Sequence, residues 1–167
     1  IIGGAHSGIS VGADGATHQA LEDISIMRTL PNMTVISPCD ATQTRIALKS
    51  CIENLNGPIY FRYGRNAVPD FSTETQHFEI GKGQILSSGK DVCIIATGHM
   101  TWYAHLAAQL LSKKNIEAMV INIHTIKPLD YEMIVSAAEY CGAIVCCEEH
   151  QIFGGLGGAV SEVVSQH

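Results

Sequence analysis

Short apolar segments alternate with longer segments of helical periodicity along most of the chain. Apolar residues dominate MTVIS (33–37), DVCIIATG (91–98) and EAMVINIHTI (117–126). Between such segments, apolar residues recur every three or four positions, as they do on one face of a helix. Apolar strands separated by helices are typical of a largely parallel sheet that helices cover on both faces. The sequence therefore predicts the α/β fold class.

Five segments have the periodicity of helices. The expected helices span residues 21–30, 39–54, 100–114, 131–141 and 154–165. Asp40 is a suitable N-cap for the second of them, because aspartate accepts hydrogen bonds from the free amides at a helix start. The residues expected to face the core are Leu21, Ile24, Met27 and Leu30 in the first helix, Leu48, Cys51, Ile52 and Leu55 in the second, and Met100, Tyr103, Ala107, Leu110 and Leu111 in the third. Further strands are expected in IYFRYG (59–64), in FEIGKGQILSSG (78–89, a strand pair or an entry strand) and in GAIVCCEE (142–149).

A change of composition divides the chain in two. NAVPDFSTETQH (66–77) combines prolines and small polar residues without periodicity, which indicates a linker. We expect one unit over residues 1–70, a linker over 71–77 and a second unit over 78–167. The chain begins without methionine and stops inside an expected helix, so we expect it to be part of a longer protein.

Composition and charge exclude several classes of partner. The chain has 167 residues, of which 46% are hydrophobic, and a formal net charge of −6 without a cluster of lysines and arginines. Nucleic acids and anionic membrane surfaces are bound by basic faces, so neither is expected as a partner. No apolar run is long enough to span a membrane and no signal peptide is recognisable, which favours the cytoplasm. The six cysteines lie mostly in apolar runs and are expected to be reduced thiols.

The segment from Gly3 to His18 is rich in glycine and carries ionisable side chains. It holds five glycines, two histidines (His6 and His18) and one acid, Asp14. Glycine lets the backbone adopt unusual angles or a ligand approach closely, and a helix start attracts oxyanions and hydroxyls. One interpretation is therefore the wall of a binding site. The alternative is structural: Thr17 caps the following helix and Asp14 complements its dipole, with both histidines in solvent.

Two arginines in YFRYGRN (60–66) form a second candidate site. At the end of a strand, Arg62 or Arg65 can bind a phosphate through two parallel hydrogen bonds. Residues three apart on a strand face opposite sides, so at most one of the two is expected in a given cleft. Either arginine can instead lie on the surface, stacked on Tyr60 or Tyr63.

The motif CCEEHQIFGGLGG (146–158) invites a metal or phosphate interpretation. Cys147 and His150 have the spacing of metal ligands, but no second pair occurs at a matching distance, so no metal site is predicted. The GGLGG run lacks the Lys-Ser/Thr of a P-loop. We interpret the motif as a strand, an acidic turn and a glycine-rich helix start.

Little chemical machinery is visible elsewhere in the sequence. His99, His105 and His124 are isolated and are expected to be structural. The sequence has no nucleophile elbow of serine or cysteine and no paired carboxylates. A binding wall without reactive groups favours chemistry by a cofactor, bound mostly by residues outside this chain.

Several spaced motifs resemble those of transketolases. They are HSGISVGADGATHQALEDISIMRTLPNMTVISPCD (6–40), GPIYFRYGRN (57–66), FEIGKGQILSSGKDVCIIATG (78–98), INIHTIKPLD (121–130) and CCEEHQIFGGLGGAVSEVV (146–164). Their order matches over nearly the whole chain, and the resemblance is greatest to the C-terminal subunit of split transketolases. It implies that residues 1–70 form the second half of a pyrimidine-binding α/β domain. Residues 78–167 would then form most of a transketolase C-terminal-like α/β domain.

The resemblance also implies roles for individual residues. His6 and Arg65 match the residues that hold the phosphate of the sugar substrate, with Arg62 as the fallback for Arg65. Asp14 matches an aspartate that binds a substrate hydroxyl near the reacting carbons. His18 matches a position that faces both the substrate and the thiamine cofactor. Asp14 and His18 are therefore the expected catalytic residues.

Transketolases use thiamine diphosphate and Mg²⁺ to transfer a two-carbon ketol unit between sugar phosphates, as in the pentose phosphate pathway. The family motifs that bind the diphosphate and Mg²⁺ and that activate the thiamine ring have no counterpart in this sequence. The resemblance therefore implies a partner, either a second copy in a homodimer or an N-terminal subunit that carries the diphosphate-binding domain. Alone, the chain is expected to be inactive and to bind no thiamine diphosphate tightly.

Two alternatives remain. Deoxyxylulose-phosphate synthase, which decarboxylates pyruvate and joins the product to glyceraldehyde phosphate, resembles the chain at GADGATHQ (12–19), RYGRNAV (62–68) and GGLGGAVSEV (154–163). The segments ALEDISIMRTLPNMTVISPCD (20–40) and IATGHMTWYAHLAAQLL (95–111) are more similar to transketolase. The other alternative is a non-catalytic module that only holds a dimer together.

Overall fold

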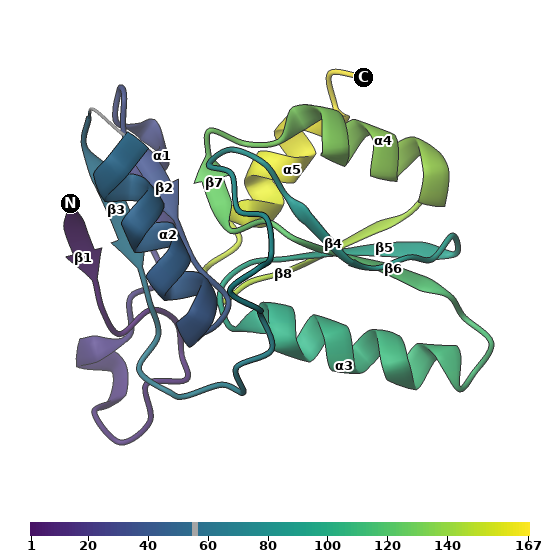
Figure 1. The fold of residues 1–167 in the computed structure, drawn as a ribbon, viewed down its shortest axis with the longest axis horizontal. Coiled ribbons are helices and arrows are strands. Elements are labelled where there is room, and N and C mark those ends of the chain that lie inside the picture. The colour runs from purple at the N-terminus through teal and green to yellow at the C-terminus, as the bar shows by residue number, and fades with distance from the viewer. Residues whose placement is uncertain (55–56) are drawn as a thin grey trace.

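Two four-stranded sheets, each covered by helices, make up the molecule (Figure 1). The computed structural model describes residues 1–54 and 57–167. Within these residues, no helix combines the length and the apolar character needed to cross a membrane.

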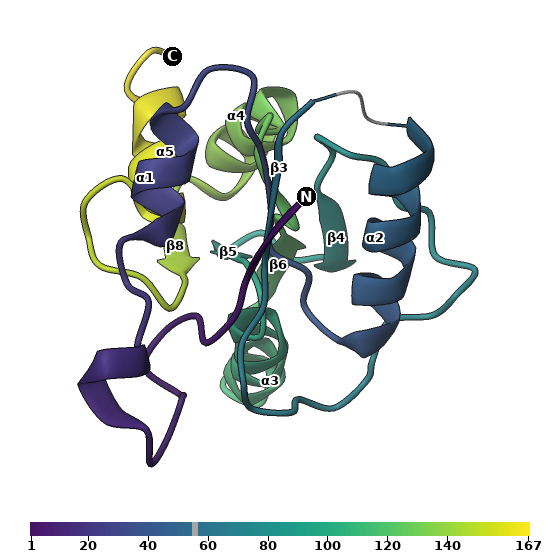
Figure 2. The ribbon, with the colours of Figure 1, turned by 90° about the vertical axis from the view of Figure 1, so that its left-hand side faces the viewer.

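The first sheet has helices on both faces. Its elements are β1 (Ile2–Gly4), η1 (Gly15–His18), α1 (Asp23–Thr29), β2 (Thr34–Ile36), α2 (Ala41–Asn54), β3 (Ile59–Arg62) and β7 (Thr125–Lys127). The strand order is β1-β3-β2-β7, with β7 antiparallel to β2 and the other pairs parallel. Figure 2 shows α1 on one side of these strands and α2 on the other. Ile24 of α1 packs against Val35, whereas Ala47 of α2 packs against Ile36 on the opposite face.

The second sheet has the same layered arrangement. Its elements are β4 (Gln84–Ser87), β5 (Val92–Ala96), α3 (Met100–Ser112), β6 (Ala118–Asn122), α4 (Tyr131–Cys141), β8 (Ile144–Cys147) and α5 (Leu156–Val164). The strand order is β4-β6-β5-β8, and only β4 is antiparallel to its neighbour. In Figure 1, α3 lies below this sheet and α4 and α5 lie above it. Both sheets are mostly parallel between layers of helices, which confirms the predicted α/β class.

The segment between β6 and β7 contacts both sheets. The strand expected over residues 117–126 divides into β6 in the second sheet and β7 in the first. Between them, the Ile123 amide donates to the Ala96 carbonyl (2.8 Å), and the His124 carbonyl accepts from the Ser37 amide (2.8 Å). Each sheet thus uses backbone groups of this segment, which bends the strand. The predicted domain boundaries stay a prediction, although β7 comes from the second expected unit and pairs in the first sheet.

The expected linker is tied to the start of α2. The Asp40 carboxylate accepts from the Gln43 amide at 2.8 Å, which confirms Asp40 as a helix cap. Its second oxygen accepts from the amides of Phe71 (3.0 Å) and Ser72 (2.6 Å). One carboxylate therefore both starts the helix and fixes the irregular segment that leads to the second sheet.

The predicted inner face of α2 is correct at Cys51 but wrong at Leu48 and Ile52. Leu48 and Ile52 are exposed, and the buried residues are Thr42, Gln43, Ala47 and Cys51. Leu55, also expected inside, lies outside the described residues. Gln43 is buried because its carbonyl oxygen accepts from the Cys39 amide (2.9 Å) and from Asn122 Nδ2 (3.1 Å). A polar contact between the two sheets, and not an apolar stripe, thus sets the orientation of this helix.

Two other helices also differ from expectation. In α3, Tyr103 and Leu110 are exposed, and the buried face consists of Thr101, Ala104 and Ala108, whose small side chains let the helix approach the sheet. The first helix begins at Asp23 instead of residue 21, and Leu30 is exposed just beyond its end. Thr17 does not cap α1, because it lies in η1, a separate turn of helix.

Candidate functional site

The candidate site lies where two parallel strands of the first sheet end. Gly4 of β1 pairs with Arg62 of β3, and the pairing continues through hydrogen bonds from the Tyr63 amide to the Gly4 carbonyl (2.9 Å) and from the Ser7 amide to the Tyr63 carbonyl (3.3 Å). The segments that follow the two strands therefore start side by side. In open α/β sheets, ligands bind outside the carboxyl ends of the strands.

Residues 6–20, which follow β1, form a closed loop. The Ala20 amide donates to the His6 carbonyl (3.2 Å), and the Gly8 amide donates to the Ala20 carbonyl (2.8 Å). Loops of this length whose ends meet are compact and frequently functional. His6 has a φ of 61°, a conformation that costs a non-glycine residue energy and is concentrated at functional sites. We call residues 6–20 the site loop.

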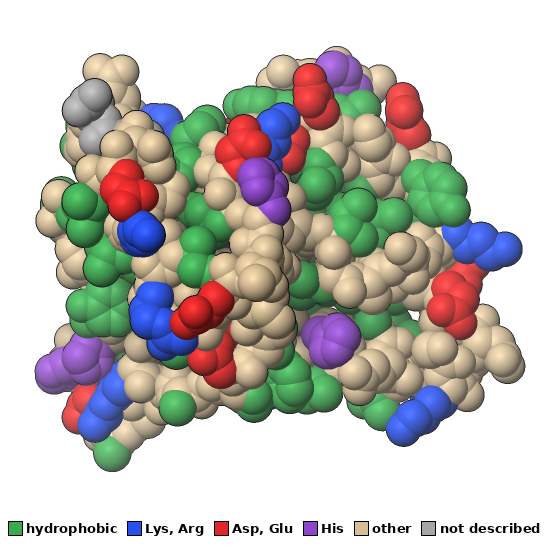
Figure 3. All heavy atoms as spheres, in the orientation of Figure 1, with side chains coloured by type: hydrophobic (Ala, Val, Ile, Leu, Met, Phe, Trp, Pro, Cys, Tyr) green, Lys and Arg blue, Asp and Glu red, His purple; other side chains and the backbone are tan. Residues whose placement is uncertain are grey.

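The site loop brings all four predicted site residues together. Asp14 forms an ion pair with Arg65 from the segment after β3, and its Oδ2 lies 4.0 Å from His6 Nε2. The rings of His6 and His18 have centroids 5.8 Å apart. Thr17 does not cap the helix but contacts His18 Nδ1 at 2.9 Å. Figure 3 shows histidine, acidic and basic side chains gathered at the lower left edge of the molecule, over η1.

This cluster is accessible to a ligand. The side chains of Arg65 and Asp14 are 45% and 34% exposed. Arg65 Nη1 also donates to the Val11 carbonyl (2.9 Å), while its Nε and Nη2 make no hydrogen bond within the described part of the chain. A guanidinium with two free donors can bind an oxyanion, and a carboxylate beside two imidazoles can hydrogen-bond hydroxyl groups.

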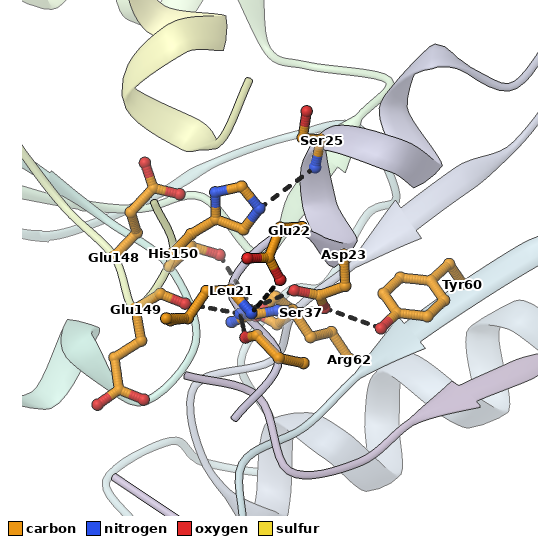
Figure 4. A network of polar contacts seen from close by, with 12 residues as sticks. Leu21, Glu22, Asp23, Ser25, Ser37, Tyr60, Arg62, Glu148, Glu149 and His150 are labelled. Carbon is orange, nitrogen blue, oxygen red and sulfur yellow. Dashed lines mark hydrogen bonds and ion pairs between the residues drawn. The ribbon is translucent and has the colours of Figure 1, made fainter. Parts of the chain in front are cut away.

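Arg62, the fallback for phosphate binding, lies in a buried network instead. Its side chain is only 3% exposed, and Nε donates to Asp23 Oδ2 at 2.7 Å. Nη2 donates to the Glu149 carbonyl (2.6 Å) and to Asp23 Oδ1 (3.2 Å), as Figure 4 illustrates. The Tyr60 hydroxyl also donates to Asp23 (2.8 Å), and burial together with this bond raises the pKa of Tyr60. The Arg62 guanidinium is therefore not accessible to a phosphate.

The glycine-rich motif after β8 binds a side chain of the chain itself. The Glu148 carboxylate accepts from the amides of Leu156 (2.6 Å) and Gly157 (2.8 Å) at the start of α5. A Cβ on Gly155 would overlap this carboxylate, which explains the glycine at that position. The motif is thus an acidic turn that caps a helix, as interpreted from the sequence.

Neither the cysteines nor His150 add reactive groups. All six cysteines are free thiols, as predicted. Burial raises the pKa of each of them, to about 12 at Cys93 and about 11 at Cys146, so they stay protonated at neutral pH. His150 binds backbone groups: Nε2 accepts from the Ser25 amide (3.4 Å), and Nδ1 contacts the Gln151 carbonyl (2.8 Å). No group of three or more potential metal ligands occurs among residues 1–54 and 57–167.

Sequence reasoning missed one polar cluster beneath the site loop. Ser10, His99 and Glu149 meet there, although His99 was expected to be an isolated structural residue. These residues come from three segments far apart in the chain, so no local spacing signals their contact. The sequence indicates Glu149 only as part of the acidic turn that is expected after a strand.

Comparison with protein families places two domain models on the chain. The pyrimidine-binding domain of transketolase matches residues 1–70, and the C-terminal domain of transketolase matches residues 81–167. The resemblance predicted from the motifs is thereby confirmed.

Individual relatives agree with these matches. One subunit of the apulose-4-phosphate transketolase of Phocaeicola vulgatus is 43% identical over 165 residues, which are 98% of this chain and 53% of that protein. A solved split-gene transketolase, described as an inactive β4 tetramer, is 45% identical with a TM-score of 0.91 and covers 99% of this chain and 53% of its own. The chain thus spans about half the length of each of these relatives.

Other relatives belong to the predicted alternative. The 1-deoxy-D-xylulose-5-phosphate synthase of Crocosphaera subtropica is 39% identical over 160 residues, which are 94% of this chain and 25% of that protein. Split transketolase subunits precede these synthases in similarity and share a larger part of their own length with this chain.

Proposed function

The chain belongs to the transketolase family, and from this premise we propose that it forms the substrate-binding half of an active site that transfers a two-carbon ketol unit between sugar phosphates. The observation that carries the proposal is the meeting of His6, Asp14, His18 and Arg65 on and beside one exposed loop. These four side chains form the donor and acceptor set that a phosphorylated, hydroxylated substrate needs.

In this proposal Arg65 and His6 bind the substrate phosphate. Arg65 follows β3, and its Nε and Nη2, which make no hydrogen bond within residues 1–54 and 57–167, offer two parallel donors to an anion. Its ion-pair partner is Asp14. A phosphate would compete for the guanidinium and release the Asp14 carboxylate for other contacts.

Asp14 and His18 are the proposed catalytic residues. The Asp14 carboxylate accepts a hydrogen bond from a substrate hydroxyl near the reacting carbons and so fixes the orientation of the sugar. The ring centroids of His18 and His6 are 5.8 Å apart. In this proposal, His18 faces both the substrate and the cofactor. Its bond with Thr17 holds the imidazole in place.

The cofactor of the family is thiamine diphosphate, which supplies a nucleophilic carbon and an electron sink when bound. The donor set of the site loop fits a sugar phosphate, and His18 is the residue proposed to contact the cofactor. Groups of three or more metal ligands do not occur in the described residues, so we propose that Mg²⁺ and the diphosphate are held by another domain.

The proposal therefore includes a partner. This partner is an N-terminal subunit, or a second chain in a dimer, that carries the diphosphate-binding domain. The similar β4 tetramer of a split transketolase is described as inactive, which supports the need for a second kind of subunit. We propose that the complete enzyme works in the cytoplasm on phosphates of the pentose phosphate pathway.

An assay of the complete enzyme tests the proposal. The chain is combined with the complementary subunit, thiamine diphosphate and Mg²⁺, and offered either xylulose 5-phosphate with ribose 5-phosphate or pyruvate with glyceraldehyde 3-phosphate. Ketol transfer with the first pair supports the proposal. Reaction with only the second pair assigns the chain to the synthases, and no reaction with either supports the non-catalytic module.

A further inference from the structure

Three polar side chains from distant segments meet beneath the site loop. Ser10 belongs to the loop, His99 directly precedes α3, and Glu149 follows β8. Glu149 Oε2 lies 2.9 Å from His99 Nε2 and accepts a hydrogen bond from the Ser10 hydroxyl at 3.0 Å. The Ser10 hydroxyl also lies 3.3 Å from His99 Nε2. We call these three residues the clamp.

Glu149 is held rigidly by the rest of the molecule. Its backbone carbonyl accepts from Arg62 Nη2 at 2.6 Å, and Arg62 is itself paired with Asp23. Figure 4 shows the Glu149 carboxylate directed away from this network. Arg62 therefore fixes the Glu149 backbone, and the Glu149 carboxylate binds the site loop through Ser10.

The clamp is largely buried and closely packed. The side chains of His99 and Glu149 are 11% and 10% exposed. A Cβ on Gly8 would overlap the Glu149 carboxylate, and a Cβ on Gly64 would lie 2.9 Å from His99 Nδ1. Gly8 also has a φ of 81°, which other residues rarely adopt. The two glycines thus allow the backbone to approach the clamp from both sides.

The hydrogen-bond pattern assigns a role to each group. A buried carboxylate is tolerated when it accepts hydrogen bonds that replace water. Glu149 accepts one from Ser10, and its Oε2 also lies 2.9 Å from His99 Nε2. Hydrogen bonds to a charged acceptor are stronger than those between neutral groups, so Ser10 is held firmly.

We propose that the clamp positions the site loop for ketol transfer, an inference that rests on the proposed function. Ser10 is followed by Val11, whose carbonyl accepts from Arg65, and it precedes Asp14 by four residues. Holding Ser10 in place therefore also holds the backbone of residues 11–14, which connects the Val11 carbonyl that Arg65 binds to the proposed catalytic acid, Asp14. His99 and Glu149 adjoin elements of the second sheet, so this second unit controls the geometry of the substrate site. The clamp residues are positioning residues and do not touch the substrate.

The test uses the complete enzyme with its complementary subunit and compares four single variants and the Ser10→Ala/His99→Gln double variant. Ser10→Ala and His99→Gln each remove one member of the clamp, and His105→Gln, on the adjoining helix α3, is the matched control. Asp14→Ala reports on the proposed active site itself. The measurements are kcat and KM for ketol transfer, the melting temperature, and hydrogen exchange of the amides in residues 8–15.

We expect the two clamp variants to lower kcat roughly tenfold with KM changed less than about twofold, because misplacement of a reacting group mainly affects the transition state. Exchange in residues 8–15 should become faster while the melting temperature stays close to that of the unaltered enzyme. The double variant should be no slower than His99→Gln alone, because both changes remove the same interaction. His105→Gln should leave all of these quantities unchanged.

The outcomes separate the inference from the function on which it rests. If Asp14→Ala lowers kcat but neither clamp variant changes kcat or exchange, the clamp has no positioning role and the inference is wrong. If Asp14→Ala leaves kcat unchanged, the proposed active site is wrong. In that case the exchange measurement still shows whether Ser10 and His99 hold the loop.

Discussion

Arg62 and Arg65 are three residues apart and have opposite environments. Arg62 is buried in an ion pair with Asp23, whereas Arg65 is exposed beside Asp14. The sequence predicts that at most one of them enters a cleft, because positions three apart on a strand face opposite sides. It does not decide which one, since the partner Asp23 is 39 residues away in the chain. Burial makes this distinction, and burial depends on the whole fold.

The two arginines should therefore respond differently to substitution. Arg65→Ala should raise KM for phosphorylated acceptors roughly 10- to 100-fold, the value of a hydrogen bond to a charged group, and change KM for unphosphorylated acceptors little. Arg62→Met should lower the free energy of unfolding by about 3–5 kcal/mol, because it leaves Asp23 buried without its partner. Steady-state kinetics and urea unfolding check both. A stable Arg62→Met enzyme with a raised KM for phosphorylated acceptors would reverse the assignment.

Asp14 should discriminate between substrates by their hydroxyl groups. Asp14→Ala should lower kcat/KM roughly 10- to 100-fold for acceptors or donors that carry the contacted hydroxyl, because that hydrogen bond strengthens toward the transition state. Deoxy analogues lack the contact and should lose much less. Competition kinetics with matched pairs of sugars measure the difference. Equal losses for both members of a pair would remove Asp14 from substrate binding.

At the scale of elements, the sequence predicts the existence of helices and strands better than their orientation. Every expected strand and helix has a counterpart, because apolar strands and periodic helices are encoded locally. In α2, Cys51 is buried as predicted, but Leu48 and Ile52 are exposed, because Gln43 is buried by a hydrogen bond from Asn122 across the sheets. The site loop has no periodicity; its glycines suggested a binding wall with His6, Asp14 and His18 as one of two interpretations, and the resemblance to transketolases joined Arg65 to them.

The start of α5 depends on one acidic side chain. Glu148 accepts from the Leu156 and Gly157 amides, which have no partner within the helix, and its charge complements the helix dipole. Glu148→Gln should lower the free energy of unfolding by about 1–2 kcal/mol. Glu139→Gln, on α4, is the matched control and should have no measurable effect. Similar unfolding curves for the two variants would contradict this role of Glu148.

At the scale of the molecule, the segment between β6 and β7 holds the two sheets together, and His124 lies buried in it. Its ring stacks on Phe78 with centroids 4.2 Å apart, and Nδ1 contacts the Thr125 hydroxyl at 2.9 Å. Nε2 is buried without a hydrogen-bond partner among the described residues. The sequence predicts a structural role for His124, but not the bend that buries it. The bend arises where consecutive residues, Ile123 and His124, form backbone hydrogen bonds to different sheets.

Burial of His124 makes the stability of the fold depend on pH. Desolvation lowers its pKa from 6.5 to about 4. Between these two pH values, His124 is therefore neutral in the folded chain and protonated in the unfolded chain. This contribution to stability is complete above pH 6.5 and is lost as the pH falls toward 4, up to about 3 kcal/mol. Urea unfolding between about pH 7.5 and 4.5, a range that spans most of this titration, measures it. His124→Phe keeps the ring and should flatten this pH dependence, whereas an unchanged slope would mean that other groups cause it.

The central claim is that this chain supplies the substrate side of an active site whose cofactor is held mainly by another domain. Calorimetric titration of thiamine diphosphate with Mg²⁺ into the chain alone, and then into its mixture with the complementary subunit, tests that claim most directly. We expect heat of binding in the mixture and none with the chain alone. Tight binding by the chain alone would show that it carries its own cofactor determinants and would contradict the account.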